Sequence, residues 1–529
     1  MEDSLYFRNM KPAVTNERQT FRWYWQMHFL LVPLFFIIHN SIDFYGLVSF
    51  KAVMPSFAGW LLLPAATALV FYWFLRPLPK ALLFTAVLML AGFFSIPLMQ
   101  WFRSVPALSF MGRYSVFLAV LLVLLLLFFL KLRKSQYGYP RFGRFLTACL
   151  FVLIAYDLGY ALMKGRTELL LRNRMQQVNP PELQASSGML KNHPDIYFLV
   201  YDAFPGSQEA KEVLQVDLSS MDSVLQSMGF KVQAHVQAAA ASTYISLFST
   251  LNMCYPPLGN QTKINFRDLH SALAALQESN VPAYLRSKNY EIVNAGLFPL
   301  LDQPGPYKNE EWAIRSPEFM FYNQTLWNAV ERDFGWVHKL LHATTLAELL
   351  NEKIRKEVDF FHRTEELVLH TKPPQTRPRF VYAHFNLPHG PYKFRHDGSV
   401  IQWKSDREYE LADRKQLMRE QVLFTQSVLP ALCAAIQKTT NRQAVILVQG
   451  DHGLRGDDLK GFPQDYAFKT YSAVFFPEIV PAEIPDSLYL PNTFRFVFNQ
   501  YFGQSLPLLK PRSFDLTYFG EEHIFWDDL

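Results

Sequence analysis

The stretch Ala444-Val445-Ile446-Leu447-Val448-Gln449-Gly450-Asp451-His452-Gly453 decides the fold class of the second half of the chain. Its unbroken apolar start is typical of a strand that is buried on both faces of a parallel sheet. Asp451 and His452 follow the end of that strand, where open α/β sheets bind their ligands. Gly450 and Gly453 are expected to let the backbone turn tightly there. A carboxylate beside an imidazole is half of a metal site, although an isolated Asp-His-Gly is more often a polar loop.

Two more apolar runs end in residues of the same kind. Residues 196–201 are followed at once by Asp202, and residues 380–384 end in His384. Between these runs, three segments have helical periodicity: 217–228, 284–288 and 422–436. One further strand is expected at 291–294. This alternation predicts an α/β domain with a central, mostly parallel sheet. Because the carboxyl ends of parallel strands meet at one edge, we expect Asp202 and Asp451 on the same rim.

A pair of hydroxyl residues, Ser242 and Thr243, stands at the start of a helical pattern that extends to Met253. One interpretation is helix capping, in which a hydroxyl accepts from the backbone N–H groups of the first turn. The other is a nucleophile, whose attached phosphate would rest on those same N–H groups and on the helix dipole. Capping is the better interpretation of the pair alone. A threonine hydroxyl needs a metal or a base to become a nucleophile, so the second interpretation depends on the flanking carboxylates.

Two histidines accompany a turn rich in proline and glycine just beyond the third strand, in the segment His384-Phe385-Asn386-Leu387-Pro388-His389-Gly390-Pro391-Tyr392. A single histidine is usually structural. Two of them at the carboxyl end of a sheet strand are candidates for a functional site.

The first 164 residues have the composition of a membrane domain. The chain has 529 residues, of which 50% are hydrophobic and 16% aromatic, and most of the hydrophobic excess lies before residue 164. Five apolar segments approach the length of about 20 residues that a bilayer requires: 23–42, 58–75, 81–99, 114–130 and 145–163. The sequence therefore predicts five transmembrane helices. Asp157 lies inside the last of them, where it is expected to face a headgroup cavity or to hydrogen-bond a neighbouring helix.

The distribution of basic residues orients these helices. One side of the membrane would carry Arg8, Lys11, Arg18, Arg22, Arg76, Lys80, Lys131, Arg133, Lys134, Arg141 and Arg144, and the other side Lys51, Arg103 and Arg113. The richer side is the cytoplasmic one, so the N-terminus is expected in the cytoplasm and everything after residue 164 outside it.

Charge and cysteine content exclude several other classes of protein. The net charge of +5 is small and comes largely from residues that flank apolar segments, so we expect no nucleic-acid partner. Cys149, Cys254 and Cys433 are too few for a disulfide framework, and whether Cys254 and Cys433 pair stays open. The expected organisation is a membrane domain over 1–164, a linker over 165–192 and one catalytic domain over 193–529.

The order of these motifs resembles the alkaline phosphatase superfamily. Within it, the chain is most similar to the membrane-anchored sulfatase-like group that contains lipoteichoic acid synthases and lipid A phosphoethanolamine transferases. The resemblance implies one divalent metal ion, zinc or manganese, held by Asp202, Thr243, Asp451 and His452, with Thr243 as the nucleophile. It also implies that His384 and His389 bind the phosphate or assist the incoming group. Whether these two histidines hold a second metal stays open.

The chain departs from the family pattern in two places. The first acidic ligand is often Glu in the transferases, whereas Asp202 is one carbon shorter. A sulfatase of the formylglycine type would carry Cys or Ser in the pattern Cys/Ser-x-Pro-x-Arg. The segment Cys254-Tyr255-Pro256-Pro257-Leu258 mimics this pattern, but it has Leu258 in place of Arg and lies beyond the expected nucleophile.

The function that follows is transfer of phosphoglycerol or phosphoethanolamine from a membrane phospholipid to an envelope glycan or lipid, such as lipopolysaccharide, through a phospho-threonine. The expected location is the bacterial inner membrane, with several spans and the catalytic domain on the periplasmic or extracellular side. Two alternatives remain. One is a phosphodiester or sulfate ester hydrolase, in which water replaces the acceptor. The other is a non-catalytic membrane scaffold or sensor.

Overall fold

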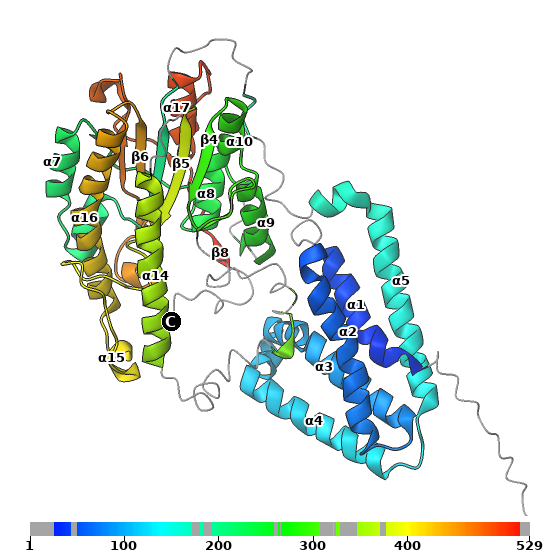
Figure 1. Ribbon diagram of the computed structural model, residues 1–529. Coiled ribbons are helices and arrows are strands. Elements are labelled where there is room, and N and C mark those ends of the chain that lie inside the picture. The colour runs from blue at the N-terminus through cyan, green and yellow to red at the C-terminus, as the bar shows by residue number, and fades with distance from the viewer. Residues whose placement is uncertain are drawn as a thin grey trace, which may run out of the picture. The chain divides into compact units, whose positions relative to one another are not determined.

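The computed structural model of the protein describes residues 26–43, 50–171, 180–183, 193–258, 263–264, 266–306, 321, 324–327, 346–370 and 377–518. These residues divide into two compact units, a helical one formed chiefly by the chain up to Tyr160 and an α/β one formed chiefly by the chain from Ala161 onward (Figure 1). Most of the expected linker at 165–192 lies outside the described residues or at the end of a helix.

The helical unit consists of long apolar helices: α1 (His28–Asp43), α2 (Phe50–Tyr72), α3 (Leu78–Ser104), α4 (Tyr114–Lys134) and α5 (Pro140–Leu171), with a 3-10 helix at Pro106–Gly112 between α3 and α4. Many side chains of α4 are exposed, among them Leu122, Leu124 and Leu127. An apolar surface of this kind is stable in hydrocarbon rather than in water. The unit therefore has the character of a membrane domain.

Three of the helices are long and apolar enough to cross a bilayer in the part of the chain that the structure describes: Leu78–Met99, Tyr114–Lys134 and Pro140–Met163. The other two apolar stretches are shorter, His28–Ile42 and Phe57–Tyr72. α1 has 16 residues, which is fewer than the roughly 20 that a bilayer requires. The expectation of five spans is thus supported for three.

The intramembrane carboxylate of Asp157 hydrogen-bonds a neighbouring helix rather than facing an open cavity. Its Oδ2 atom lies 2.9 Å from Nδ1 of His39 on α1. Near the other end of α1, Nδ1 of His28 lies 3.3 Å from Oγ1 of Thr147 on α5. Polar contacts of this kind fix helices against one another in an apolar environment.

A reporter inserted between Asp43 and Phe50 should distinguish five spans from three. If α1 and α2 both cross, this point lies outside the cytoplasm, whereas it lies inside if only α3, α4 and α5 cross. A reporter after Leu183 should be active outside the cytoplasm in both cases, and one at Ser135 inside. An alkaline phosphatase fusion read beside a fluorescent cytoplasmic reporter makes the measurement. The opposite pattern at Ser135 and Leu183 would overturn the orientation itself.

The α/β unit contains a six-stranded sheet with strand order β2-β7-β6-β1-β5-β4. The strands are β1 (Ile196–Tyr201), β2 (Lys231–Val232), β4 (Glu291–Ala295), β5 (Arg379–Phe385), β6 (Val445–Gly450) and β7 (Ser472–Phe475), and β3 (Lys263–Ile264) pairs separately with β8 (Thr517–Tyr518). The four strands β6, β1, β5 and β4 are parallel, while β7 runs antiparallel to β6 and to β2. The sheet is therefore mixed, with a parallel centre. The short strands β2 and β7 were not predicted.

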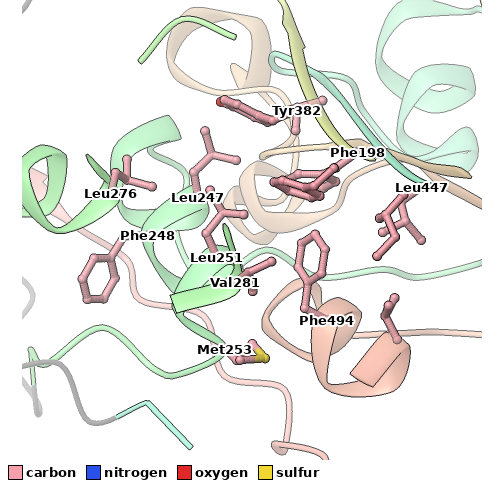
Figure 2. Packing of buried hydrophobic residues seen from close by; sticks show 14 of the residues in the cluster. Phe198, Leu247, Phe248, Leu251, Met253, Leu276, Val281, Tyr382, Leu447 and Phe494 are labelled. Carbon is pink, nitrogen blue, oxygen red and sulfur yellow. The ribbon is translucent and has the colours of Figure 1, made fainter. Parts of the chain in front are cut away.

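Helices cover both faces of this sheet (Figure 1). One face is covered by α6 (Ser207–Leu214), α7 (Ser219–Ser227), α14 (Leu346–Leu369) and α16 (Arg414–Thr439). The other face is covered by α8 (Thr243–Asn252), α9 (Phe266–Gln277), α10 (Asn280–Ser287) and α17 (Thr493–Tyr501). The short helix α15 (Asp406–Glu410) precedes α16. Alternate residues of each central strand enter opposite cores, because side chains alternate along a strand. Figure 2 shows one core, in which Phe198 and Leu447 of the sheet pack with Leu247 and Leu251 of α8. This packing fixes α8 beside the sheet.

Candidate active site

The register of the central strands places the two predicted acidic ligands side by side. Tyr201, the last residue of β1, is paired with Gly450, the last residue of β6. Asp202 and Asp451 each follow directly, so they leave neighbouring strands at the same level. The Ala203 N–H donates to Oδ1 of Asp451 over 2.9 Å, which ties the two strand ends together. Ala203 itself has φ of 60°, a left-handed conformation that costs about 1–2 kcal/mol for a residue with a Cβ.

Asp202, Asp451 and His452 form a buried group that could hold a metal ion. One ligand atom from each residue lies within 4.8 Å of the others. Nε2 of His452 is 3.6 Å from Oδ1 of Asp202 and 3.7 Å from Oδ2 of Asp451. These two carboxylate oxygens are buried and have no hydrogen-bond partner among the described residues. Buried, unpaired carboxylate oxygens facing one imidazole nitrogen are the donor set of a divalent cation, so the residues fit the expected metal.

The hydrogen bonds of His452 leave its metal-facing nitrogen without a proton. Nδ1 donates to the carbonyl oxygen of Gly453 over 2.8 Å, which assigns the proton to that nitrogen and the lone pair to Nε2. Burial lowers the pKa of His452, although the carboxylate of Asp451 opposes this shift. A neutral imidazole with its Nε2 lone pair aimed at two carboxylates is the form that ligates metals.

The histidines around Asp202 keep it ionised. Burial raises the pKa of the Asp202 carboxyl, but His389, His384 and His452 together outweigh burial and hold this pKa below its ordinary value. Asp202 is therefore an anion in the folded protein, as a metal ligand must be.

The two glycines of the motif are needed for space rather than for a tight turn. Neither Gly450 nor Gly453 has a positive φ, so a left-handed conformation is not the reason for either glycine. A Cβ on Gly450 would lie 2.6 Å from the carbonyl oxygen of Phe204, and one on Gly453 would lie 2.3 Å from that of Lys469. Since backbone atoms cannot give way as a side chain can, only glycine lets the loop pass so close to its neighbours.

Thr243 is the first residue of α8, and its hydroxyl faces the candidate metal ligands. Oγ1 of Thr243 lies 3.4 Å from Nε2 of His452, and the residue is buried. Ser242 occupies the N-cap position but makes no side-chain capping bond. Ser246, one turn further along, donates its hydroxyl to the carbonyl oxygen of Asp451 and so fixes α8 against the metal-binding loop. The structure therefore does not support the capping interpretation of the hydroxyl pair.

His384 is oriented by a buried tyrosine. The hydroxyl of Tyr382 lies 3.0 Å from Nδ1 of His384, and Nε2 of the same ring lies 3.6 Å from Oδ2 of Asp202. Burial raises the pKa of Tyr382 far above its usual value, so the hydroxyl keeps its proton. A buried O–H needs an acceptor, and donation to Nδ1 leaves the imidazole proton on Nε2. With this tautomer, His384 faces the site as a hydrogen-bond donor.

His389 lies on the loop after β5, next to the backbone of Asp202. The His389 N–H donates to the carbonyl oxygen of Asp202 over 3.2 Å. Its ring Nδ1 donates to the carbonyl oxygen of Gly390 over 2.7 Å, so Nε2 is an acceptor, and Nη2 of Arg455 lies 3.1 Å from it. The structure therefore brings His389 to the same rim as the other predicted residues, and it adds Arg455, which the sequence alone did not single out.

A buried lysine, also missed from the sequence, holds the loop that carries His389. The ammonium of Lys393 donates to the carbonyl oxygens of Asn386, His389 and Pro391 and lies 3.7 Å from Oε2 of Glu357. Gln421 of α16 binds the same loop: its amide group donates to the His389 carbonyl oxygen over 3.1 Å and accepts from the Lys393 N–H over 2.8 Å. Burial lowers the pKa of Lys393 to about 8, and Glu357 opposes this shift.

Replacing Lys393 by methionine should destabilise the protein by about 3–5 kcal/mol, because it removes the buried ammonium that lies 3.7 Å from the Glu357 carboxylate and that binds three carbonyl oxygens of the loop. The double variant Lys393→Met with Glu357→Gln should recover part of this loss, since it removes both charges and keeps the Glu357 acceptor for Asn386. Melting temperatures of the metal-loaded protein in detergent make the comparison. Equal melting temperatures for the wild type and Lys393→Met would contradict the proposed role of Lys393 in holding the loop that carries His389.

Because the pKa of Lys393 is lowered, the difference in stability between the wild type and Lys393→Met should depend on pH. The Lys393 ammonium titrates near 8 in the folded protein, compared with 10.5 as the ordinary value. Between these values the unfolded chain binds more protons than the folded protein, so the unfolding free energy rises with pH. The melting temperature of the wild type should therefore increase relative to that of Lys393→Met as the pH is raised from 8 toward 10. If the wild type instead loses melting temperature relative to Lys393→Met over this range, the lowered pKa of Lys393 is wrong.

The sulfatase-like cysteine lies away from the candidate nucleophile. Cys254 follows the carboxyl end of α8, while Thr243 begins it, and a helix of ten residues separates them by about 15 Å. Burial raises the pKa of the Cys254 thiol to about 12, which makes it inert. Cys254 and Cys433 belong to the cores on opposite faces of the sheet, and both are free thiols.

No family model matches the chain, and no curated protein matches its sequence. Among solved structures, the periplasmic domain of the phosphoethanolamine transferase EptC from Campylobacter jejuni is 10% identical, with 60% of this chain and 93% of that chain covered and a TM-score of 0.35. A protein in the alkaline phosphatase superfamily from Vibrio parahaemolyticus is 12% identical over 60% of this chain and 71% of that chain, with a TM-score of 0.34.

A third similar structure is the periplasmic domain of EptC from Escherichia coli in complex with Zn, which is 10% identical over 58% of this chain and 82% of that chain, with a TM-score of 0.33. A putative sulfatase from Bacteroides fragilis is also among the similar structures. At TM-scores of 0.32 to 0.35 these structures are distant likenesses, and the proposed function rests on the geometry of the site.

Proposed function

We propose that the protein is a membrane-anchored, metal-dependent phosphotransferase that moves a phosphoglycerol or phosphoethanolamine headgroup from a membrane phospholipid to an envelope glycan or lipid. The observation that carries this proposal is the position of Thr243. Its hydroxyl stands at the first residue of a helix, 3.4 Å from Nε2 of His452 and beside the unpaired oxygens of Asp202 and Asp451. A hydroxyl, a metal-ligand set and a helix N-terminus converge where a phosphoryl group would be attacked and held.

Asp202, Asp451 and His452 would hold one divalent cation, with Thr243 as a further ligand, and carboxylate with imidazole donors suit zinc or manganese. When bound, the cation would lower the pKa of the Thr243 hydroxyl and polarise a phosphoryl oxygen. Side chains of the protein carry out the two chemical steps.

In the first step, Oγ1 of Thr243 attacks phosphorus, and the bond from phosphorus to the diacylglycerol oxygen breaks. Thr243 loses one proton, and the diacylglycerol gains one as it leaves as a neutral alcohol. The N–H donor of His384, facing Asp202, and the N-terminus of α8 stabilise the negative charge on the transferred group. The product is a phospho-threonine that carries the headgroup.

In the second step, the hydroxyl of the acceptor attacks the same phosphorus, and Nε2 of His389 accepts its proton. The bond to Thr243 breaks, and the threonine oxygen regains a proton. A lipid donor explains why the site would be attached to a membrane domain, because the anchor raises the effective concentration of headgroups around it. We place the enzyme in a bacterial inner membrane, with its α/β unit on the periplasmic or extracellular side.

The test is intact-mass measurement of the full-length protein in detergent with a lipid donor and no acceptor. Phosphatidylglycerol and phosphatidylethanolamine form the two arms, and the mass gain identifies which headgroup is accepted. A transferase should keep the adduct until an acceptor hydroxyl is added. Prompt release of the free headgroup phosphate would instead identify a hydrolase. If no adduct, no release and no metal are found in either arm, the protein is a scaffold and the proposal is wrong.

A further inference from the structure

Arg455 joins the three loops that carry the candidate catalytic residues. It lies three residues after His452 on the loop beyond β6. Its Nη1 atom donates to the carbonyl oxygen of Ala241, two residues before Thr243, over 3.2 Å, and Nη2 lies 3.1 Å from Nε2 of His389. The side chain is half-buried, and its charge acts on the imidazole of His452. A permanent cation therefore stands at the centre of the site.

The contact between Arg455 and His389 is one that a substrate can replace. Nδ1 of His389 donates to Gly390, so Nε2 is a neutral acceptor for the guanidinium. An oxyanion also attracts the guanidinium cation by its negative charge, which the neutral imidazole of His389 lacks. The planar fork of donors also matches the oxygens of a tetrahedral oxyanion better than a single ring nitrogen. A phosphoryl or sulfuryl group in the site would thus compete successfully for Arg455.

We propose that Arg455 binds the non-bridging oxygens of the substrate's phosphoryl or sulfuryl group, and that its transfer from His389 to the substrate frees Nε2 of His389. This inference rests on the proposed function and assigns the residue that recognises the oxyanion. Only after the substrate is bound can His389 take the proton of the incoming hydroxyl. That proton then returns to the Thr243 oxygen as the bond from phosphorus to threonine breaks, so the cycle leaves each residue as it began.

In this arrangement, His389 becomes available as a base only after a substrate has bound. In the free enzyme, the lone pair of His389 is occupied by Arg455 and is a poor acceptor for the proton of a stray water. Once the oxyanion has engaged Arg455, the same lone pair becomes available at the side of the site where the second nucleophile enters. Arg455 would therefore act both in binding the substrate and in the timing of the proton transfer.

The experiment is calorimetric titration of the full-length, metal-loaded protein in detergent with inorganic phosphate and, separately, inorganic sulfate. Arg455→Met should weaken binding of the preferred anion by about 10- to 100-fold, the range expected for a lost hydrogen bond to a charged group. Arg455→Lys keeps the charge without the fork and should recover part of the affinity. Arg442→Met is the matched control, because Arg442 also donates to a backbone carbonyl, that of Met228, but is exposed and outside the site.

Unchanged affinity in Arg455→Met for both anions, with normal melting temperature and metal content, would overturn the inference. A loss of affinity as large in Arg442→Met as in Arg455→Met would overturn it as well. The preferred anion, phosphate or sulfate, reports which of the two groups the fork fits. If Arg455→Met does not fold, Arg455→Lys decides the question through the ratio of its affinity to that of the wild type.

The titration is repeated in a Thr243→Ala background, which cannot form a covalent adduct. The same loss of affinity on changing Arg455 in this background supports the role of Arg455 even if the phospho-threonine is never found. Failure of the proposed function and failure of this inference are therefore separate results. With a substrate, Arg455→Met should raise KM, whereas His389→Ala should lower kcat with little change in KM.

Discussion

Thr243→Ala should reduce turnover by roughly 10³-fold or more, because the variant lacks the hydroxyl oxygen that we propose forms the covalent intermediate. Asp202, Asp451 and His452 are untouched, so the variant should still bind one metal ion. Thr243→Ser keeps a hydroxyl at the start of α8 and should stay within about tenfold of the wild type. Initial rates with a labelled lipid donor, together with metal content, make the measurement.

The neighbouring hydroxyl provides the control for this prediction. Ser242 is buried beside Thr243 but makes no side-chain capping bond, so Ser242→Ala removes no hydrogen bond from the first turn of α8. Its turnover should fall by less than about threefold. Full activity in Thr243→Ala would eliminate covalent catalysis by this residue. A large loss in Ser242→Ala together with a small one in Thr243→Ala would move the nucleophile to the other member of the pair.

Asp451→Asn should weaken metal binding by more than roughly 100-fold and turnover by at least about a thousandfold. Oδ1 of Asp451 accepts from the N–H groups of Ala203 and His452, and the asparagine Oδ1 can keep both bonds. The substitution replaces Oδ2, the buried oxygen without a hydrogen-bond partner. It therefore tests the ligand role with little disturbance of the loop.

Asp451→Asn should also change stability in opposite directions with and without metal. In the metal-free wild type, the carboxylates of Asp202 and Asp451 face each other in a buried site and repel. The metal-free variant should thus melt at a higher temperature than the metal-free wild type, while the metal-loaded wild type should melt higher than both. Thermal scans after chelation and after addition of zinc or manganese test this. If the metal stabilises the variant as much as the wild type, Asp451 is not a ligand.

The features that could be predicted from sequence are those set by local patterns. Unbroken apolar runs before Asp202, His384 and Asp451 identified the three central strands, because a strand buried on both faces has no polar position. The meeting of the two aspartates also followed, since parallel strands share one rim. Four strands were missed because they are too short for any periodicity: β2, β3 and β8 have two residues each and β7 has four.

The parts of the site that could not be predicted depend on contacts between distant segments. Arg455 and Lys393 look like ordinary surface cations in the sequence. Their importance comes from partners on other elements, His389 on another loop and Glu357 on α14. Gly450 and Gly453 suggested a tight turn, but they are required by the backbones of Phe204 and Lys469, which come from other parts of the chain. Neighbouring residues cannot reveal such approaches.

The order of strands in the sheet has a consequence for how the protein is made. β1 lies between β5 and β6, and both of these are synthesised long after it. About 184 residues (385 − 201) separate the ends of β1 and β5, which at translation rates of about 5–20 residues per second is roughly 10 to 40 s. Throughout this interval, a wholly apolar segment has neither of its sheet partners available and is open to wrong association. We therefore expect this strand order to increase the dependence of the protein on a holding chaperone during its biogenesis.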